Sequence, residues 1–212
     1  MRTKLRFSTR IDFSPSSTDV IQQAFRANGM YDPNSTGVGH QPRGFDEFMK
    51  VYKTFTVLGS SISVTYMYEG YNGPTQTSGA ANLTQNIGAV ADTPALPPAV
   101  CGLPKGVDAL TAGAAEKQME KDRTKWTFLT GVSGVSTLRD TLKVSDFYGK
   151  QKLVGSDGYT GAANADPAEQ ILWQVWVGRG SNDYPDDTSK ITTYVTIEYD
   201  AVFTEPVQLT AS

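Results

Sequence analysis

The stretch MYDPNSTGVGHQPRGFDEFMKVYKTFTVLGSSISVTYM, residues 30–67, contains a loop, a short helix and a long strand in that order. Proline and several glycines interrupt its first half, because proline fixes φ and glycine adopts conformations that other residues avoid. The apolar residues Phe45, Phe48, Met49 and Tyr52 then follow at helical spacing, which predicts a short amphipathic helix. From Phe55 the period changes to two and predicts a strand whose apolar face holds Leu58, Ile62, Val64, Tyr66 and Tyr68.

Alternating apolar and polar residues recur along the rest of the chain and predict further strands. We expect eight strands in all, at residues 5–13, 21–27, 55–68, 83–91, 125–129, 134–144, 171–177 and 191–203. The fifth and sixth are predicted to form a hairpin, because a glycine-rich turn separates them. Residues 92–106 contain four prolines and are predicted to be an exposed loop, whereas residues 109–122 are expected to hold a short helix.

The expected fold class is all-β. Eight strands with long connections exclude a simple up-and-down barrel and favour an eight-stranded single jelly-roll β-sandwich, with one or two short helices in the connecting loops. A length of 212 residues suits one domain, 1–212.

Composition excludes several classes of protein. The single cysteine, Cys101, permits no internal disulfide, and no apolar run approaches the roughly 18 residues that cross a bilayer, so no membrane partner is expected. A net charge of −3 argues against a surface that is basic all over, as proteins that bind nucleic acid without specificity usually have.

Three stretches resemble the capsid proteins of circular, Rep-encoding single-stranded DNA (CRESS-DNA) viruses, a circovirus-like single jelly-roll family: residues 25–33, 37–46 and 196–206. Residues 52–60 are similar too, and the likeness is weakest between residues 69 and 121. The resemblance implies a homo-oligomer, an icosahedral shell of sixty copies that encloses circular single-stranded DNA. It also implies localisation in the virion, with assembly in the host cell, in the nucleus.

The basic side chains near the start of the chain are the candidate nucleic-acid contacts: Arg2, Lys4, Arg6 and Arg10. They lie on the polar face of the first predicted strand, where they can contact phosphates, although a solvated strand face is the simpler interpretation. Capsid proteins of the family usually begin with a long basic arm, and the first ten residues here supply only these four cations. We therefore expect weak neutralisation of DNA and empty particles.

The loop before the short helix is the candidate subunit interface, through Tyr31, Asp32, His40, Gln41 and Arg43. His40 is the only histidine in the chain, and catalysis would require a nucleophile and an orienting group beside it. We expect a structural histidine that forms hydrogen bonds within the loop, close to a subunit contact.

Two further clusters have both a functional and a simpler interpretation. Carboxylates and one amide crowd residues 182–187 and form a weak calcium candidate, although a solvated acidic loop is favoured: Asn182, Asp183, Asp186 and Asp187. Trp173 and Trp176 point to opposite faces of one strand, so at least one belongs to the core and the other can support an interface. With Trp126, they could alternatively form a platform for carbohydrate.

These observations predict self-assembly rather than catalysis, with no cofactor. The alternative from another class is a jelly-roll carbohydrate-binding, lectin-like module. A metal-dependent jelly-roll enzyme is disfavoured, since a single histidine cannot supply its usual metal centre.

Overall fold

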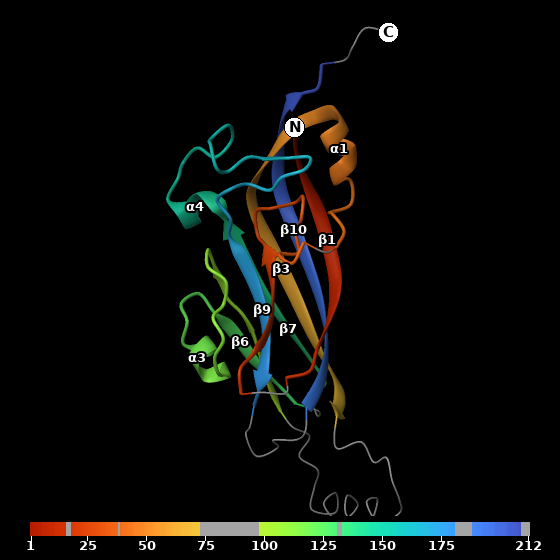
Figure 1. Cartoon of the computed structure of the whole chain (residues 1–212), viewed down its shortest axis with the longest axis vertical. Coiled ribbons are helices and arrows are strands. Elements are labelled where there is room, and N and C mark those ends of the chain that lie inside the picture. Colours follow the sequence, from red (N-terminus) through yellow and green to blue (C-terminus); the bar gives the residue numbers. More distant parts are fainter. Residues whose placement is uncertain (16–17, 38, 73–97, 131–132, 181–187, 209–212) are drawn as a thin grey trace, which may run out of the picture.

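The computed structural model describes residues 1–15, 18–37, 39–72, 98–130, 133–180 and 188–208. Eight long strands form two antiparallel sheets that pack face to face (Figure 1). The first sheet has the order β1 (Arg2–Phe13), β10 (Thr188–Pro206), β3 (Tyr52–Asn72) and β7 (Val135–Lys143). The second has the order β2 (Ile21–Arg26), β9 (Leu172–Arg179), β4 (Ala99–Leu103) and β6 (Lys125–Leu129). Two short strands, β5 (Lys105–Gly106) and β8 (Gly161–Ala162), add to β9 and β3 respectively.

The strand order is that of a jelly roll. If the eight long strands are counted along the chain, the first sheet contains the first, eighth, third and sixth, and the second contains the second, seventh, fourth and fifth. Successive long strands therefore belong to different sheets, except for the fourth and fifth, and the connections wrap around the sandwich. The predicted fold class is confirmed.

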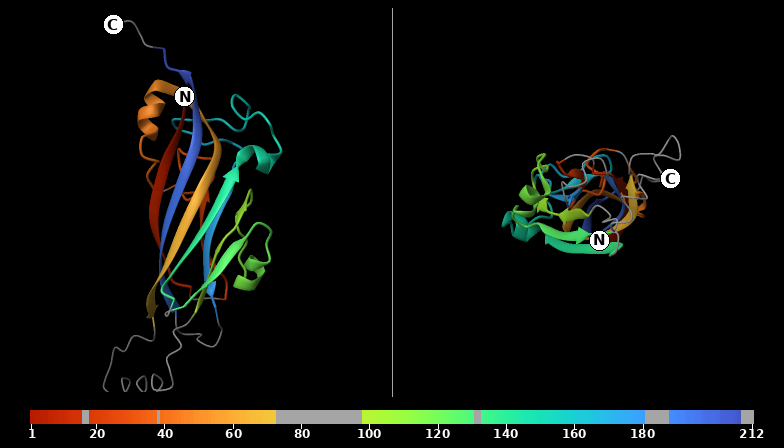
Figure 2. Two further views of the ribbon diagram at one scale, coloured as in Figure 1. Left: turned by 180° about the vertical axis from the view of Figure 1, so that it is seen from behind. Right: turned by 90° about the horizontal axis from the view of Figure 1, so that it is seen from below.

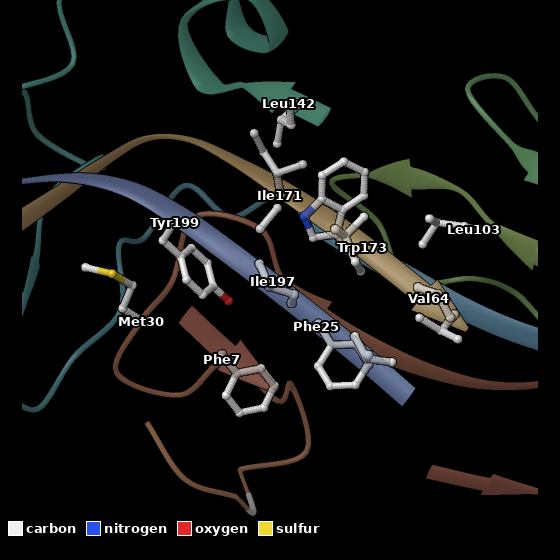
Figure 3. Packing of buried hydrophobic residues seen from close by; sticks show 14 of the residues in the cluster. Phe7, Phe25, Met30, Val64, Leu103, Leu142, Ile171, Trp173, Ile197 and Tyr199 are labelled. Carbon is white, nitrogen blue, oxygen red and sulfur yellow. The ribbon is translucent and has the colours of Figure 1, made fainter. Parts of the chain in front are cut away.

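The core lies between the two sheets, where inward-facing side chains of both interdigitate (Figure 3). Phe7, Phe25, Trp173 and Ile197 are almost completely buried there. Tyr199 is also buried, and its hydroxyl donates a hydrogen bond to the backbone oxygen of Arg26 at 2.8 Å. This bond links β10 of one sheet to β2 of the other, so burial of the phenol leaves no unsatisfied polar group.

The expected short helix is present as α1 (Phe45–Val51), and it begins after Gly44, whose φ is 89°. Phe45 is buried against Phe55, with ring centroids 5.3 Å apart, and Phe48 stacks on Phe203 at 4.8 Å. α1 thus lies against the ends of β3 and β10 (Figure 1).

A β-bulge in β3 corrects the predicted face of that strand. Val57 pairs with Ala201 and Gly59 with Asp200, so Leu58 is an extra residue without a partner in the ladder. The bulge reverses the alternation: odd-numbered residues such as Phe55 are buried before it, and even-numbered residues from Ile62 onward are buried after it. A strict period of two misses this reversal.

Two other predictions are wrong. β4 lies inside the segment expected to be an exposed loop, and all five of its residues are buried. β6 and β7 do not form a hairpin, because β6 pairs with β4 and β7 pairs with β3 in the opposite sheet. Short apolar strands flanked by proline carry little periodicity, and a turn does not reveal whether the chain changes sheet.

Two short helices complete the described part of the chain. α3 (Ala115–Met119) falls within the expected helical segment, and α4 (Val144–Tyr148), which follows β7, was not expected. The strand predicted at residues 83–91 lies outside the described residues. Within the described ranges no helix is both long and apolar enough to cross a membrane.

Candidate nucleic-acid interface and assembly surfaces

The basic side chains of β1 all lie on the outer face of the first sheet, where each is more than half exposed. Each is also paired with a carboxylate. Arg2 donates to Asp200 with an Nε–Oδ1 distance of 2.9 Å, and Lys4 donates to Glu198 at 2.7 Å. Arg6 donates to the other oxygen of Glu198 at 3.3 Å. Arg10 lies 3.5 Å from Asp12.

These pairings follow from the register of β1 and β10, which places Arg6 opposite Glu198 and Lys4 opposite Asp200. Hydrogen bonds from Lys4 and Arg6 lower the pKa of Glu198, and the hydrogen bond from Arg2 lowers the pKa of Asp200. Both carboxylates are therefore ionised at neutral pH. A phosphate must compete with them for the cations of β1, although exposed ion pairs of this kind are weak and exchange readily with solvent ions.

The same face carries further basic groups and a hydroxyl-rich floor. Arg139 and Lys143 are exposed on β7, and the serines and threonines of β3 and β10 lie between β7 and β1. A hollow of about 840 Å³ opens here between Arg2, Lys4 and Lys143, and a second one of about 370 Å³ lies beside Arg6 and Arg139. The arrangement suits a polyanion better than β1 alone does, because cations flank the hydroxyl floor on both sides.

The structure divides the predicted interface loop into anchored and exposed residues. His40 contacts two backbone oxygens, through Nε2 to Ser8 and through Nδ1 to Gln41, each at 2.9 Å. Its ring also packs on Phe7, with centroids 4.8 Å apart. The backbone N–H of Arg43 donates to the oxygen of Arg6 at 3.3 Å. The loop therefore attaches to β1, while the side chains of Tyr31 and Arg43 remain exposed.

Asp32 belongs to a partly buried ionic cluster that sequence reasoning missed. Arg26 of β2 lies 3.1 Å from Asp32 and 3.6 Å from Asp166. Asp166 also accepts hydrogen bonds from the backbone N–H groups of Tyr31 and Asp32, at 3.0 and 3.1 Å. Burial raises the pKa of Asp166, and the positive charge of Arg26 and the two N–H donors offset this only in part.

The residues of the candidate metal site lie outside the described part of the chain: Asn182, Asp183, Asp186 and Asp187. Within the described ranges, no group of three or more histidine, cysteine, aspartate or glutamate side chains could hold a metal ion.

Trp173 and Trp176 lie on opposite faces of β9, as predicted. Trp173 is buried in the main core, and its indole N–H donates to the hydroxyl of Ser60 at 3.1 Å. Trp176 points to the outer face of the second sheet, but it is fully buried there in a small cluster of Val20, Val100, Leu110 and Ala115. Its predicted interface role is therefore wrong, because the segment around α3 covers it. Trp126 is 42% exposed and lies beside Phe128, which is 55% exposed.

The chain matches no model of a known protein family, and no curated protein is significantly similar to it. Among solved structures, a similar fold occurs in Desmodium yellow mottle tymovirus, with 8% identity, 100% of this chain and 93% of that chain covered, and a TM-score of 0.39. A second occurs in turnip yellow mosaic virus, with 8% identity, 100% of this chain and 99% of that chain covered, and a TM-score of 0.40. A third is a picornavirus capsid from an expanded equine rhinitis A virus particle, with 9% identity, 96% of this chain and 73% of that chain covered, and a TM-score of 0.40. Similarities of this size carry no argument about function.

Proposed function

We propose that this chain is a viral capsid protein that assembles into a closed icosahedral shell. The observation that carries the proposal is the position of the three stretches that resemble capsid proteins of CRESS-DNA viruses. The first two stretches are neighbours in sequence and the third lies about 150 residues later, but all three meet in the fold, at the end of the sandwich formed by β1, β2 and β10. The Tyr199 hydroxyl donates to the backbone oxygen of Arg26, which joins the third stretch to the first. His40 contacts Ser8 of β1, and Ser8 pairs with Thr196 of β10, which joins the second stretch to the third through β1.

These contacts give the likeness a structural meaning. Residues 25–33 include the end of β2, and residues 196–206 form the last half of β10. The stretch 37–46 includes the loop attached to β1 and the first two residues of α1. A chance match of two regions far apart in the sequence would not be expected to fall on segments that contact each other. The jelly-roll strand order is compatible with the same function, since loops at the ends of the sandwich are available for contacts between copies.

The finer parts of the proposal extend the resemblance. We propose that residues 1–212 form a single domain, that sixty copies form the shell in virions assembled in the nucleus, and that the cargo is circular single-stranded DNA. The loop residues predicted at a subunit contact would lie near one: Tyr31, Asp32, His40, Gln41 and Arg43. Arg2, Lys4, Arg6 and Arg10 would face the genome, but their pairing with Glu198, Asp200 and Asp12 supports weak retention of DNA and hence largely empty particles.

Electron microscopy of the purified chain, with sedimentation at several salt concentrations, tests the proposal. We expect uniform closed particles with an absorbance ratio typical of protein alone after nuclease treatment. Monomers under all salt and pH conditions would contradict assembly. Particles that retain nuclease-resistant DNA would support the capsid function and contradict the expectation that they are empty.

A carbohydrate-binding module is the second candidate, and one observation favours it. The exposed ring of Trp126 could stack on a sugar. The two other tryptophans are buried and add nothing to such a platform. Binding of the chain to a glycan array, lost in a Trp126→Ala variant, would support this alternative.

A further inference from the structure

The four edge strands of the sandwich differ in how their outer backbone groups are covered. Exposed edges invite pairing with another chain, and proteins usually protect them. In the first sheet the edges are β1 and β7, and in the second they are β2 and β6 (Figure 2). β1 and β2 lie on one narrow side of the sandwich, because the loop of residues 33–44 bonds to both.

Three of these edges are covered by the chain itself. The oxygen of Arg6 on β1 accepts from the N–H of Arg43, and on β2 the N–H of Arg26 donates to Pro33 at 2.8 Å. On β7 two lysines perform the same function. Lys125 donates to the backbone oxygen of Arg139 at 2.7 Å, and Lys105 donates to that of Thr141 at 3.0 Å.

β6 differs from the other three edges. One of its sides pairs with β4, and within the described residues no backbone group pairs with its other side. The side-chain hydrogen bond to its backbone is local, from the hydroxyl of Thr127 to the oxygen of Phe128 at 3.3 Å, so no other element of the described chain covers this edge. Its outward-facing side chains are Trp126 and Phe128, whose rings pack edge to face at 5.5 Å and 83°. Both are large exposed hydrophobic side chains, and the only charged residue of the strand, Lys125, reaches toward Asp140 on β7 at 3.0 Å.

We propose that β6 pairs in antiparallel fashion with β6 of a second copy of this chain, so that the second sheets of two copies join into one continuous sheet. The sequence KWTFL is complementary to itself in this arrangement. With Thr127 at the two-fold axis, Trp126 of each copy lies opposite Phe128 of the other. Directly opposed aromatic residues are favourable cross-strand pairs.

Charge supports the same register. Lys125 of one copy lies opposite Leu129 of the other, so no like charges face each other across the axis. Shifting the strands by two residues in either direction would leave one aromatic of each copy without an aromatic partner. A two-fold axis also makes the contact closed and isologous, which limits it to two copies.

Cysteine pairing tests the contact and its register. Trp126→Cys and Phe128→Cys variants are mixed, oxidised and separated without reductant. We expect a disulfide-linked dimer from the mixture and little from either variant alone, because directly opposed Cβ atoms are within disulfide range and diagonal ones are not. In the mixed dimer, the second cross-strand pair keeps its native residues, with Trp126 of one copy opposite Phe128 of the other. Cys101 is buried and its thiol is inert at neutral pH, since burial raises its pKa.

A Tyr194→Cys variant mixed with Phe128→Cys is the matched control, because Tyr194 is an exposed aromatic on the outer face of the other sheet. It should give no dimer. Equal cross-linking in all mixtures, or none in any, would overturn the proposal. As a second measurement, a Trp126→Lys, Phe128→Lys double variant should weaken self-association roughly a hundredfold, since buried aromatic anchors dominate contacts between proteins. Its melting temperature should stay near that of the wild type.

The inference rests on the proposed function only in that both require self-association, and the outcomes separate them. Cross-linked dimers without particles would support the β6 contact and contradict the shell. Particles with no cross-link between positions 126 and 128 would overturn the β6 contact alone. If the double variant loses glycan binding while its association state is unchanged, the aromatic pair serves a carbohydrate and the inference is wrong.

Discussion

The two narrow sides of the sandwich differ in how their edge strands are protected from pairing with another chain. On the side of β1 and β2, the loop of residues 33–44 bonds to both edge strands, and His40 packs on Phe7 from outside. On the side of β6 and β7, lysines cover β7, whereas β6 keeps an open edge in the described part of the chain. The comparison suggests that the first side secures the fold and that the second is available to a partner.

Buried charge also differs between the two sides. On the side of β1 and β2, which we call the closed side, Arg26 lies between two carboxylates, and its side chain is only 18% exposed. On the side of β6 and β7, which we call the open side, Asp140 lies between Lys105 and Lys125, at 2.7 and 3.0 Å. One side thus has two carboxylates around a cation, and the other has two cations around a carboxylate.

The largest effect is expected from Arg26→Ala, which breaks the closed side. Removal of the guanidinium leaves Asp32 and Asp166 without their partner, and breaking a largely buried pair costs about 3 kcal/mol in the free energy of unfolding. Urea unfolding measures the loss. Arg43→Ala is the matched control, because Arg43 contacts β1 through its backbone and its side chain is exposed, and it should change the stability by less than about 0.5 kcal/mol. Equal losses in both variants would contradict the assigned role of the cluster.

A smaller loss is expected from Gly102→Ala, next to the open side. The ring of Trp176 lies directly over Gly102, and a Cβ at residue 102 would come within 2.1 Å of its Cε2 atom. Because Trp176 is enclosed, it must shift together with its neighbours, and overpacking of this kind costs about 2 kcal/mol. Gly106→Ala on β5 is the control, since its nearest neighbour would be Nε2 of Gln174 at 3.9 Å. Thermal unfolding that separates the two variants would support the packing; identical curves would argue against it.

The two sides should also respond to pH with opposite signs. Burial alone would raise the pKa of Asp140, but hydrogen bonds from Lys105 and Lys125 bring it below its ordinary value. Its contribution to stability is therefore present above the unfolded pKa of about 3.9 and is lost as pH falls through the folded value. The raised pKa of Asp166 acts in the other direction, so its contribution declines as pH rises above about 3.9.

Comparison of Asp140→Asn and Asp166→Asn by urea unfolding across acidic pH checks these signs. The advantage of the wild type over Asp140→Asn should shrink on acidification, and its advantage over Asp166→Asn should grow. The same trend in both variants would show that the two clusters are not electrostatically distinct.

Local patterns in the sequence predicted most of the strands and α1, because alternation and helical spacing are properties of neighbouring residues. They failed where the local structure depends on a contact between residues that are far apart in the sequence. The bulge at Leu58 depends on the register with β10, and the sheet change between β6 and β7 depends on β3 and β4. The basic row of β1 was visible in the sequence, but its pairing with Glu198 and Asp200 joins residues almost 200 positions apart. No local signal indicates that these cations are already paired.

This pairing leads to the prediction with the smallest effect on stability. Glu198→Gln removes the carboxylate shared by Lys4 and Arg6. Since both cations are largely exposed and Glu198 is partly exposed, the stability should hardly change. The two freed cations should bind single-stranded DNA more tightly at low salt, and the slope of log K against log salt should steepen by about 0.7 for each additional phosphate contacted. Fluorescence anisotropy with a labelled thymidine oligonucleotide measures both quantities. Glu116→Gln, on the exposed side of α3, changes the net charge equally but lies on the other sheet, so it should leave the affinity unchanged. An equal gain in both variants would mean that net charge alone governs binding, and that the face of β1 is not the site.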